Sequence, residues 1–422
     1  DRRRVEAAIG RSARQVVMHT LEIFWDFSSP FAYLGTTQAD ALAARTGATL
    51  VWKPMLLGGV FRANETPQKL FATLAPAKAR HNGEDMDRWA RLFDVPLTMP
   101  NAHPFRTVEA LRATIATGID PNVVAAFYRA YWVENRPPSD ESTLREVLGK
   151  AGHDADAILV RIKSEELKSD LFKRTDEAIA HGIFGAPAFV VDGERLYWGQ
   201  DRMHMALGIR AEEAYPFSRA TPQTETSRMR TLDFFWDFSS PFAYLGNTQA
   251  EAVAERTRAK LVPRPMLLGG LFKAIGQVDV PLSTWSDAKR NYYLQDIVRW
   301  ADYWGVPFKW PSRFPMSTIK SLRAYLALPE NRRLDFRRKV FAAYWAEDRD
   351  IADDAVLAEI IGDGAADVLA KTQDPAVKQE LIDATKYAEK KGVFGAPTWI
   401  VDDQDLFWGQ DRVLLVERAL TQ

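Results

Sequence analysis

The chain of 422 residues contains no cysteine. This absence excludes a disulfide, a cysteine nucleophile and a cysteine-rich metal site, and it permits a reducing compartment. Long apolar runs are also lacking, since no stretch approaches the roughly 18 residues that a membrane span needs. Neither sign of charge dominates, because 55 basic and 56 acidic residues leave a formal net charge of −1. No overall basic surface is therefore expected to recruit nucleic acid or an anionic membrane.

The opening residues 1–17 lack the apolar segment of a signal peptide. They are rich in arginine, which leaves import into an organelle open, but two acidic residues weaken that interpretation. We interpret them as an N-terminal extension, either a short accessory helix or a start-site artefact, because Met18 stands where a domain begins. The expected location of the protein is cytoplasmic.

One stretch of twelve residues, FWDFSSPFAYLG, occurs unchanged at 24–35 and at 235–246. Other landmarks recur at spacings close to 211 residues, and self-similarity at a nearly fixed spacing indicates a repeated unit. We therefore expect a tandem of two domains, at 18–208 and 229–422. The segment 209–228 between them is polar, contains two prolines and is typical of a linker.

Each repeat follows one plan, which the first repeat illustrates. Residues 21–27 have the β-branched and aromatic content of a strand, a helical pattern follows Pro30, and 48–55 is a second strand. From 78 to about 182 the patterns are helical, and 185–199 is typical of a β-hairpin before a short closing helix. This order of elements predicts the α/β class. A thioredoxin-like core with a large helical insertion fits the order, but that assignment depends on the motifs below.

The duplication restricts the chemistry that the repeats share, because both must carry the residue types that it needs. All six histidines lie in the first half of the chain, the last being His204. A catalytic or metal-binding histidine common to both repeats is therefore excluded, and no EF-hand, HExxH or phosphate-loop spacing is present. We expect no metal, and we interpret His81 and His103 as packing or surface residues.

The first motif that points to chemistry is the identical dodecamer. Its order of strand, small polar residue, proline and helix places Ser29 at a helix N-terminus, where free N–H groups and the helix dipole favour an anion. A serine there is more often a simple N-cap. A cap tolerates Thr, Asp or Asn, however, so the identity of the whole stretch in both repeats favours a function. Asp26 is interpreted as a buried carboxylate that accepts hydrogen bonds from loop N–H groups.

Two further motifs recur in both repeats. IFGAPAFVVDG at 183–193 and VFGAPTWIVDD at 393–403 place a proline directly before a strand, which suits a turn with a cis bond. Such a turn leaves backbone groups to pair with an extended peptide, although it equally serves as a rigid turn. YWGQDR (197–202) and FWGQDR (407–412) end the hairpin and open the last helix. Asp201 is either the cap of that helix or the acceptor for the ammonium group of a zwitterion.

In this order and spacing the three motifs resemble the kappa-class glutathione transferases and the 2-hydroxychromene-2-carboxylate isomerases, in the DsbA-like branch of the thioredoxin superfamily. The resemblance covers essentially the whole of each repeat. It also includes KPMLLGGVFR and RPMLLGGLFK, for the family's RPx-x-x-x-G-x-x-K region, and a DxxRWA helix at Asp85–Ala90 and Asp296–Ala301. The implied fold is α/β, with two DsbA-like thioredoxin domains that each carry a large helical insertion.

The resemblance implies that Ser29-Pro30-Phe31-Ala32 stands where the redox CxxC motif of the superfamily lies, so that the sulfur arrives with the substrate as glutathione. The hydroxyl of Ser29, and that of Ser240 in the second repeat, then hydrogen-bonds the glutathione thiolate as the catalytic group. The backbone beside the cis-prolines and the Gln-Asp pairs would grip the rest of the tripeptide, a set that comprises Ala186, Pro187, Gln200, Asp201, Ala396, Pro397, Gln410 and Asp411. The acceptor-site segment implies a substrate-binding set of Lys53, Arg62, Asn64, Arg264, Lys273 and Gln277.

One departure from the family pattern concerns the acceptor site. The family's G-N-x-x-P is replaced by ANETP in the first repeat and by IGQVDVP in the second. Asn64 is displaced and Gln277 substitutes for it, so we expect the two acceptor pockets to differ.

The leading hypothesis is a glutathione-dependent isomerase of the 2-hydroxychromene-2-carboxylate isomerase type, as in aromatic catabolism. The bound thiolate would add to a conjugated small-molecule acceptor and later leave. A kappa-class-like transferase or peroxidase is the alternative, and a non-catalytic peptide-binding thioredoxin-fold module is an alternative of another class. A Ser-His hydrolase and a dithiol oxidoreductase are excluded, because the second repeat has no histidine and the chain no cysteine. The resemblance to dimeric enzymes further implies that the two repeats pack as an intramolecular pseudo-dimer.

Overall fold

The structure is a computed structural model that describes residues 19–217, 229–278 and 281–422. The expected N-terminal extension at 1–17 lies outside the described residues, and so does most of the expected linker, 218–228. Among the described residues, no helix is both long and apolar enough to cross a membrane.

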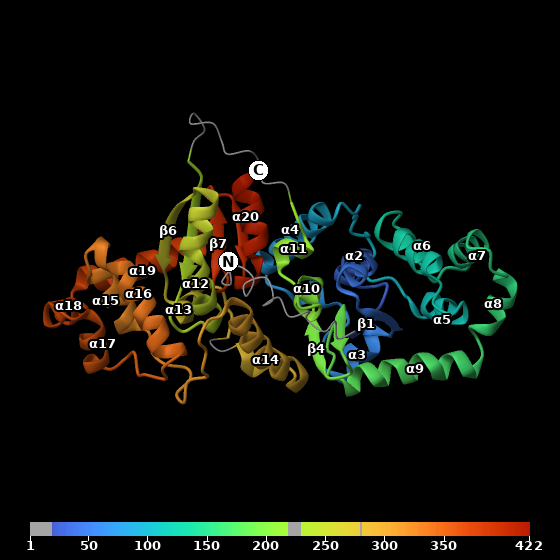
Figure 1. Cartoon of the computed structure of the whole chain (residues 1–422), viewed down its shortest axis with the longest axis horizontal. Coiled ribbons are helices and arrows are strands. Elements are labelled where there is room, and N and C mark those ends of the chain that lie inside the picture. Colours follow the sequence, from blue (N-terminus) through green and yellow to red (C-terminus); the bar gives the residue numbers. More distant parts are fainter. Residues whose placement is uncertain (1–18, 218–228, 279–280) are drawn as a thin grey trace, which may run out of the picture. The chain divides into compact units, whose positions relative to one another are not determined.

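Each repeat is built on a four-stranded mixed sheet (Figure 1). The first sheet has the order β2-β1-β3-β4, and its strands are β1 (Thr20–Trp25), β2 (Thr49–Pro54), β3 (Ala188–Val191) and β4 (Arg195–Trp198). β1 pairs in parallel with β2 and antiparallel with β3, which forms a hairpin with β4. The second sheet repeats this order as β6-β5-β7-β8, with strands β5 (Thr231–Trp236), β6 (Lys260–Pro265), β7 (Thr398–Val401) and β8 (Asp405–Trp408). All four residues of β3 and of β7 are buried, as expected for strands that are covered on both faces.

Helices account for most of the remaining chain. Those of the first repeat are α2 (Pro30–Thr46), α3 (Leu57–Ala63), α4 (Pro76–Phe93), α5 (Val108–Ala116), α6 (Pro121–Trp132), α7 (Glu141–Lys150), α8 (Ala155–Arg161), α9 (Glu165–Ala180), α10 (Met203–Ala206) and α11 (Ala211–Ala214), with the 3₁₀ turns η1 (Leu70–Thr73) and η2 (Gln200–Arg202). Those of the second repeat are α12 (Pro241–Thr257), α13 (Leu268–Ala274), α14 (Asp287–Trp304), α15 (Ile319–Ala327), α16 (Glu330–Trp345), α17 (Asp354–Ile361), α18 (Ala365–Lys371), α19 (Pro375–Lys390) and α20 (Val413–Thr421), with η3 (Pro281–Thr284) and η4 (Gln410–Arg412). The predicted α/β class and the large helical insertion between the second and third strands are confirmed.

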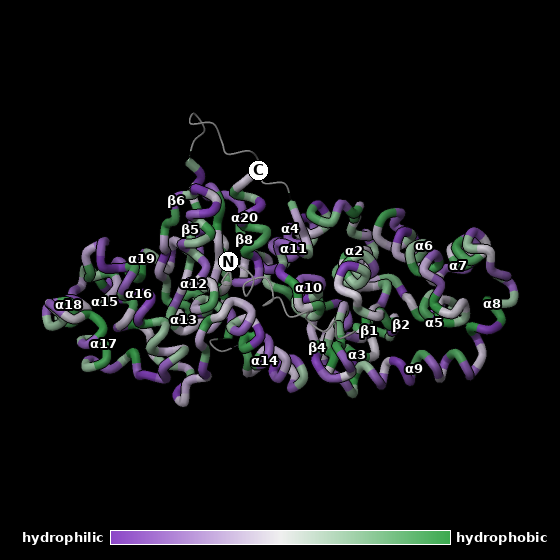
Figure 2. The backbone as a smooth tube through the Cα atoms, in the orientation of Figure 1, coloured by the Kyte–Doolittle hydropathy of each residue, from purple (hydrophilic) through white to green (hydrophobic). Residues whose placement is uncertain are grey.

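The helical insertion is amphipathic. In α9 the buried positions include Leu167, Leu171 and Ala178, which recur at the spacing of one helix face. Figure 2 shows hydrophilic and hydrophobic positions alternating along this helix. The apolar face packs toward α3 and α5, and the charged face remains toward solvent.

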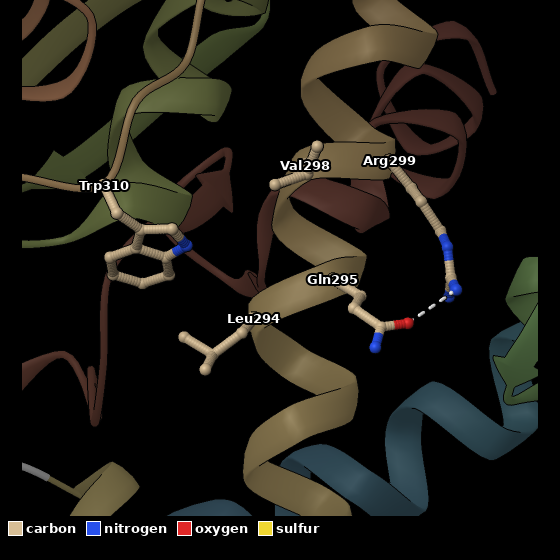
Figure 3. A pocket seen from close by; sticks show the side chains of 5 residues that line it. All are labelled: Leu294, Gln295, Val298, Arg299 and Trp310. Atoms are coloured by element: carbon tan, nitrogen blue, oxygen red, sulfur yellow. Dashed lines mark hydrogen bonds between the residues drawn. The ribbon is translucent and has the colours of Figure 1, made fainter.

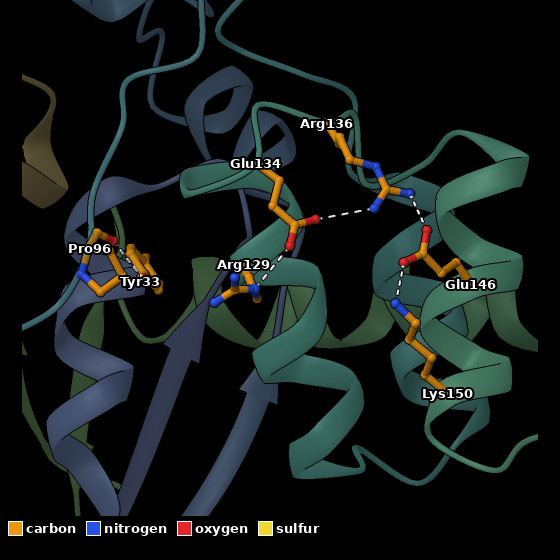
Figure 4. A network of polar contacts seen from close by, with 7 residues as sticks. All are labelled: Tyr33, Pro96, Arg129, Glu134, Arg136, Glu146 and Lys150. Atoms are coloured by element: carbon orange, nitrogen blue, oxygen red, sulfur yellow. Dashed lines mark hydrogen bonds and ion pairs between the residues drawn. The ribbon is translucent and has the colours of Figure 1, made fainter.

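A chain of ion pairs ties α6 to α7 in the first repeat (Figure 4). Glu134 pairs with Arg129 at 2.9 Å and with Arg136 at 3.1 Å, and Arg136 continues to Glu146 at 2.7 Å. Lys150 closes the chain on Glu146 at 2.6 Å. Each pair is partly exposed, so each stabilises the fold by no more than about 1 kcal/mol.

An aromatic core holds the loop that follows β1. Trp25 and Phe27 are fully buried, and their rings contact each other and Tyr128 of α6. The indole N–H of Trp132 donates to the carbonyl of Phe27 at 2.8 Å, and Trp345 does the same to Phe238 in the second repeat. The helical insertion thereby fixes the backbone from which α2 begins.

The compact units of the chain do not coincide with the sequence repeats. Residues up to 69 group with 89–215, whereas 70–88 group with the residues from 216 onward. The second unit therefore contains η1 and most of α4, which belong to the first repeat by sequence.

Residues 209–215, at the start of the expected linker, group with the first compact unit. α11 lies within it, and the ring of Tyr215 is buried against Trp89, Phe93 and His204. The Tyr215 hydroxyl also donates to the carbonyl of Gln200 at 3.2 Å. These contacts make the segment up to Tyr215 part of the first unit.

Candidate active site

Ser29 joins the start of α2 to the loop before β3. Its backbone is extended, and its Oγ accepts a hydrogen bond from the N–H of Ala32 at 3.1 Å, so the residue is the N-cap of the helix. The same hydroxyl donates to the carbonyl of Ala186 at 2.8 Å. Ser240 makes the matching bonds to Ala243 and Ala396, again at 3.1 and 2.8 Å. The cap function and the link to a second motif are therefore present together in both repeats.

Both serines are buried, with relative exposures of 4% for Ser29 and 5% for Ser240. Within the dodecamer at 24–35, only Ser28 and Phe31 are partly exposed, and every other residue is buried. Packing thus accounts for much of the identity between the repeats. Phe31, in the first turn of α2, is the one large side chain of the dodecamer that is partly exposed.

Asp26 organises the loop between β1 and α2. Its Oδ1 accepts from the N–H and the hydroxyl of Ser28, at 2.9 and 3.1 Å, and its Oδ2 accepts from the N–H of Leu57 at 2.8 Å. Burial raises the pKa of Asp26, and these hydrogen bonds oppose that rise. The expectation of a buried carboxylate that bonds loop N–H groups is confirmed, and Asp237 repeats it with Ser239, Leu268 and Thr318.

The loop before β3 contains a cis peptide bond between Ala186 and Pro187, and the loop before β7 has one between Ala396 and Pro397. Gly185 is required there, because a Cβ at this position would lie 2.5 Å from Nε1 of Trp198. The indole of β4 therefore packs directly on the backbone of the loop.

The Gln-Asp motif follows immediately after the hairpin. Gly199 has a φ of 100°, in the region that favours glycine, and a Cβ there would meet the carboxylate of Asp201. Gln200 is buried, and Asp201 pairs with Arg202 at 3.0 Å. In the second repeat Gln410 is buried as well, and Asp411 pairs with Arg412 at 3.1 Å.

Gly35 is where the three motifs meet. A Cβ on this residue of α2 would lie 3.3 Å from Cβ of Gln200 and 3.4 Å from Cγ of Pro187. The structure therefore brings Ser29, Ala186, Pro187 and Gln200 into one cluster, although Ser29 and Gln200 are 171 residues apart in the sequence.

Two of the four cationic residues of the expected acceptor site form ion pairs within their own repeat. Lys53 pairs with Glu177 at 2.7 Å and with Glu22 at 3.2 Å. Burial lowers the pKa of Lys53, but the hydrogen bonds to these carboxylates outweigh it and raise the pKa. Arg264, its counterpart, pairs with Asp233 at 2.8 Å, and its Cζ lies 5.1 Å from the centre of the Tyr387 ring. Arg62 and Lys273 are exposed at the ends of α3 and α13.

The amide residues of that expected site do not occupy equivalent positions. Asn64 donates to the carbonyl of Ile183 at 3.2 Å, so its side chain reaches the loop before β3. The N–H of Gln277 bonds Phe272 as the N–H of Thr66 bonds Phe61, which makes Gln277 the counterpart of Thr66. Ile275 stands at the helix end where the first repeat has Asn64. Gln277 and Asn64 therefore occupy different positions in the backbone register.

Three residues of α4 that were not assigned to the site lie against the hairpin of the second unit. His81 accepts a hydrogen bond at Nε2 from the N–H of Trp408 at 3.0 Å, and burial lowers its pKa to about 4. Asp85 pairs with Arg412, Nε to Oδ1, at 2.8 Å. Arg88 donates to the carbonyl of Leu406 at 2.8 Å. The repeated DxxRWA and WGQDR motifs were the signal for this contact, since they contain Asp85, Arg88 and Arg412.

A pocket in the second unit lies on α14 and is lined by Leu294, Gln295, Val298, Arg299 and Trp310 (Figure 3). It contains none of the expected site residues. Gln295 and Arg299 hydrogen-bond each other along the helix at 3.0 Å, and Leu294 and Val298 expose apolar surface. We assign the candidate site to the serine and cis-proline cluster instead, since that cluster recurs in both repeats.

A family model described as a DSBA-like thioredoxin domain matches residues 20–208 and, a second time, residues 231–421. The chain belongs to this family. A 2-hydroxychromene-2-carboxylate isomerase of Sphingobium xenophagum is 31% identical over 188 residues, which cover 44% of this chain and 94% of that protein. A glutathione S-transferase kappa 1 of Rattus norvegicus is 27% identical over 211 residues, which cover 46% and 91%. A solved 2-hydroxychromene-2-carboxylate isomerase superposes with a TM-score of 0.41 at 25% identity, covering 45% of this chain and 94% of that one.

The family model and the curated relatives confirm the expected family. Each relative matches less than half of the chain, while the DSBA-like domain matches it twice, so a tandem of two such domains fits. The relatives are isomerases and transferases, which supports the expectation that this DSBA-like protein is an enzyme.

Proposed function

We propose that the chain is a glutathione-dependent isomerase of the 2-hydroxychromene-2-carboxylate isomerase type, in which Ser29 and Ser240 each hold the thiolate of one bound glutathione. The observation that carries this proposal is the serine hydroxyl shared between a helix N-terminus and the carbonyl before a cis-proline, with the same distances in both repeats. The similarity to isomerases of this name supports the choice of reaction.

The hydroxyl reaches the sulfur by an exchange of hydrogen bonds. Ser29 has one hydroxyl proton, which is directed at the carbonyl of Ala186. An extended peptide that pairs with this loop presents its own N–H to that carbonyl, as in strand addition. The cysteinyl N–H of glutathione would thus replace the hydroxyl at Ala186 and release the Ser29 proton for the sulfur. Ser240 and Ala396 have the geometry for the same exchange.

The required stabilisation of the thiolate is small. A free thiol has a pKa of about 8.5, and lowering it by one to two units takes about 1.4–2.7 kcal/mol. One hydrogen bond to a charged acceptor contributes about 1.5–3 kcal/mol, and a helix N-terminus adds up to about 1 kcal/mol. Ser29 therefore need not attack the substrate itself, and no histidine is needed to deprotonate it.

The remaining contacts to glutathione follow from the cluster around Gly35. We assign the γ-glutamyl end to Gln200 and Asp201 and to their counterparts Gln410 and Asp411, because these pairs lie beside the cis-proline loops. Phe31, partly exposed in the first turn of α2, would form an apolar wall for the acceptor. A substrate role for Lys53, Arg62, Asn64, Arg264, Lys273 and Gln277 stays a prediction, as do the intramolecular pseudo-dimer and the cytoplasmic location.

The proposal is tested by calorimetry and by the absorbance of the bound thiolate near 240 nm. We expect glutathione to bind at two sites per chain with a thiol pKa about one to two units below that of free glutathione. Ser29→Ala should return one site to the free value. Ser164→Ala, which removes the N-cap of α9 in the same unit, is the matched control and should leave both sites unchanged. A bound thiol with the free pKa, or one unaffected by Ser29→Ala and Ser240→Ala, refutes the assignment.

Turnover separates the reaction classes. With glutathione and 2-hydroxychromene-2-carboxylate, an isomerase forms the isomer without consuming glutathione, whereas a kappa-class-like transferase depletes it. The similarity to a kappa-class transferase makes the second outcome the alternative. Binding of extended peptides without either reaction would instead identify a non-catalytic module.

A further inference from the structure

Two equivalent lysines of the second unit have no carboxylate partner among the residues that the structure describes. Lys78 of α4 and Lys289 of α14 are 211 residues apart, which is the spacing of the repeats. Lys78 Nζ lies 5.2 Å from the centre of the Trp408 ring, and Lys289 Nζ lies 4.6 Å from that of Trp285. Both side chains are half-buried.

The electrostatics of this pair are unfavourable without an anion. Burial lowers the pKa of both lysines, that of Lys289 to about 8, and the charge of Lys78 is a second cause at Lys289. Two nearby ammonium groups that are removed from water without a counter-charge destabilise each other. Aromatic faces offset part of this cost but supply no negative charge.

Each lysine contacts an aromatic ring that leads to the Ser240 cluster. The Trp408 ring next to Lys78 packs on Gly395, which directly precedes the carbonyl that accepts the Ser240 hydroxyl, that of Ala396.

Lys289 also lies over Tyr293, with Nζ 6.0 Å from the ring centre. The Tyr293 ring meets Phe242 at 6.1 Å between centres, in the first turn of the helix that Ser240 caps. One aromatic layer therefore separates each lysine from the catalytic cluster.

We propose that Lys78 and Lys289 together bind one carboxylate group of the molecule that occupies the cleft at Ser240. This inference rests on the proposed function, which places glutathione and an acceptor in that cleft. Two ammonium groups can donate to the two oxygens of one carboxylate, and the rings of Trp285 and Trp408 suit a planar apolar body attached to it. The carboxylate belongs either to an aromatic acceptor or to glutathione itself, and the site is formed once per chain.

The experiment compares charged and uncharged forms of two probes by calorimetry on the full chain. The first pair is 2-naphthoate and 2-naphthamide, measured without glutathione. The second pair is glutathione and its glycyl monoethyl ester. The variants are Lys78→Gln, Lys289→Gln and the double variant, with Lys386→Gln as the matched control, since Lys386 is an exposed lysine of α19 in the same unit.

We expect the wild-type chain to prefer the charged member of one pair by about tenfold or more at a stoichiometry of one. Each single variant should weaken the charged probe about tenfold, or about 1.4 kcal/mol. The double variant should remove the preference, while Lys386→Gln and the affinity for the uncharged probe stay within about twofold of wild type. The pair that responds identifies the source of the carboxylate.

Two outcomes overturn the proposal. One is a wild-type chain that shows no preference for the charged member of either pair. The other is a double variant that keeps the preference of the Lys386→Gln control for the charged probe while its urea unfolding transition is unchanged. Failure of the proposed function is distinct, since it shows as absent glutathione binding or an unperturbed thiol pKa, whereas the naphthoate pair requires no glutathione.

Discussion

Gly246 offers a sharp test of the packing around the cis-proline loop. It lies in α12, and a Cβ there would be 3.1 Å from Cγ of Pro397 and 3.3 Å from Cζ2 of the fully buried Trp399. Gly83 lies in the middle of α4, in the same compact unit, and a Cβ there would meet nothing within 4 Å. The same substitution to alanine therefore probes a filled and an open position.

The expected effects have opposite signs. Alanine is favoured over glycine inside a helix by about 1 kcal/mol, so Gly83→Ala should raise the free energy of unfolding by about 0.5–1 kcal/mol. At Gly246 the same gain is opposed by overpacking, which costs about 1–3 kcal/mol when stiff neighbours must move. Proline and tryptophan rings yield little, so we expect Gly246→Ala to lower the free energy of unfolding by about 1 kcal/mol. The two variants should then differ by about 2 kcal/mol.

Urea unfolding followed by tryptophan fluorescence measures this difference, and thermal unfolding should separate the variants by roughly 4–8 °C. Glutathione binding provides a second readout, because a displaced Pro397 shifts the carbonyl to which Ser240 donates. If Gly246→Ala is as stable as Gly83→Ala and binds glutathione normally, the contact between the helix and the loop is not tight and the reasoning is wrong.

Three further changes in the second unit have expected outcomes. Ser240→Ala removes a helix cap and should lower the free energy of unfolding by about 1 kcal/mol in urea, whether or not glutathione binds. Asp85→Ala leaves Arg412, whose side chain is only 14% exposed, with one carboxylate fewer, and a loss of about 2 kcal/mol is expected, smaller for Asp85→Asn; no loss would show the pair to be immaterial. Because burial lowers the pKa of His81 from 6.5 to about 4, its contribution to stability is complete above pH 6.5 and is lost as the pH falls toward 4. Between pH 7 and pH 4 the wild type should lose about 3 kcal/mol more than His81→Gln, and equal losses in urea titrations would refute this.

Local patterns in the sequence were sufficient to predict the strands, the helix that follows the dodecamer and the hydrogen bonds of Asp26 to the loop. These features depend on residues that are close along the chain, where hydrophobic periodicity and capping residues are informative. The cluster of Ser29 with Ala186 and Gln200 was accessible only through the repetition of motifs and a family resemblance.

Other features were not accessible from the sequence, for identifiable reasons. Periodicity shows that α4 has a buried face but not which unit covers it, so the assignment of 70–88 to the second unit was missed. Lys53 was assigned to the acceptor site from a family resemblance, and its ion pairs with Glu22 and Glu177 could not be predicted, because nothing in the sequence shows that these residues flank it in space. The backbone hydrogen bonds that align Gln277 with Thr66 were not visible in the sequence. The packing of Tyr215 on the first unit was not predicted, because a single aromatic residue in a polar stretch forms no hydrophobic periodicity.

The contribution of residues 70–88 to the second unit has an evolutionary consequence. Gene duplication normally frees one copy to drift, but here a substitution at Asp85 or His81 in the first copy alters the surroundings of Arg412 and Trp408 in the other. Substitutions in one half are therefore constrained by contacts with residues of the other half. A truncated gene for residues 229–422 alone would produce a protein without those partners.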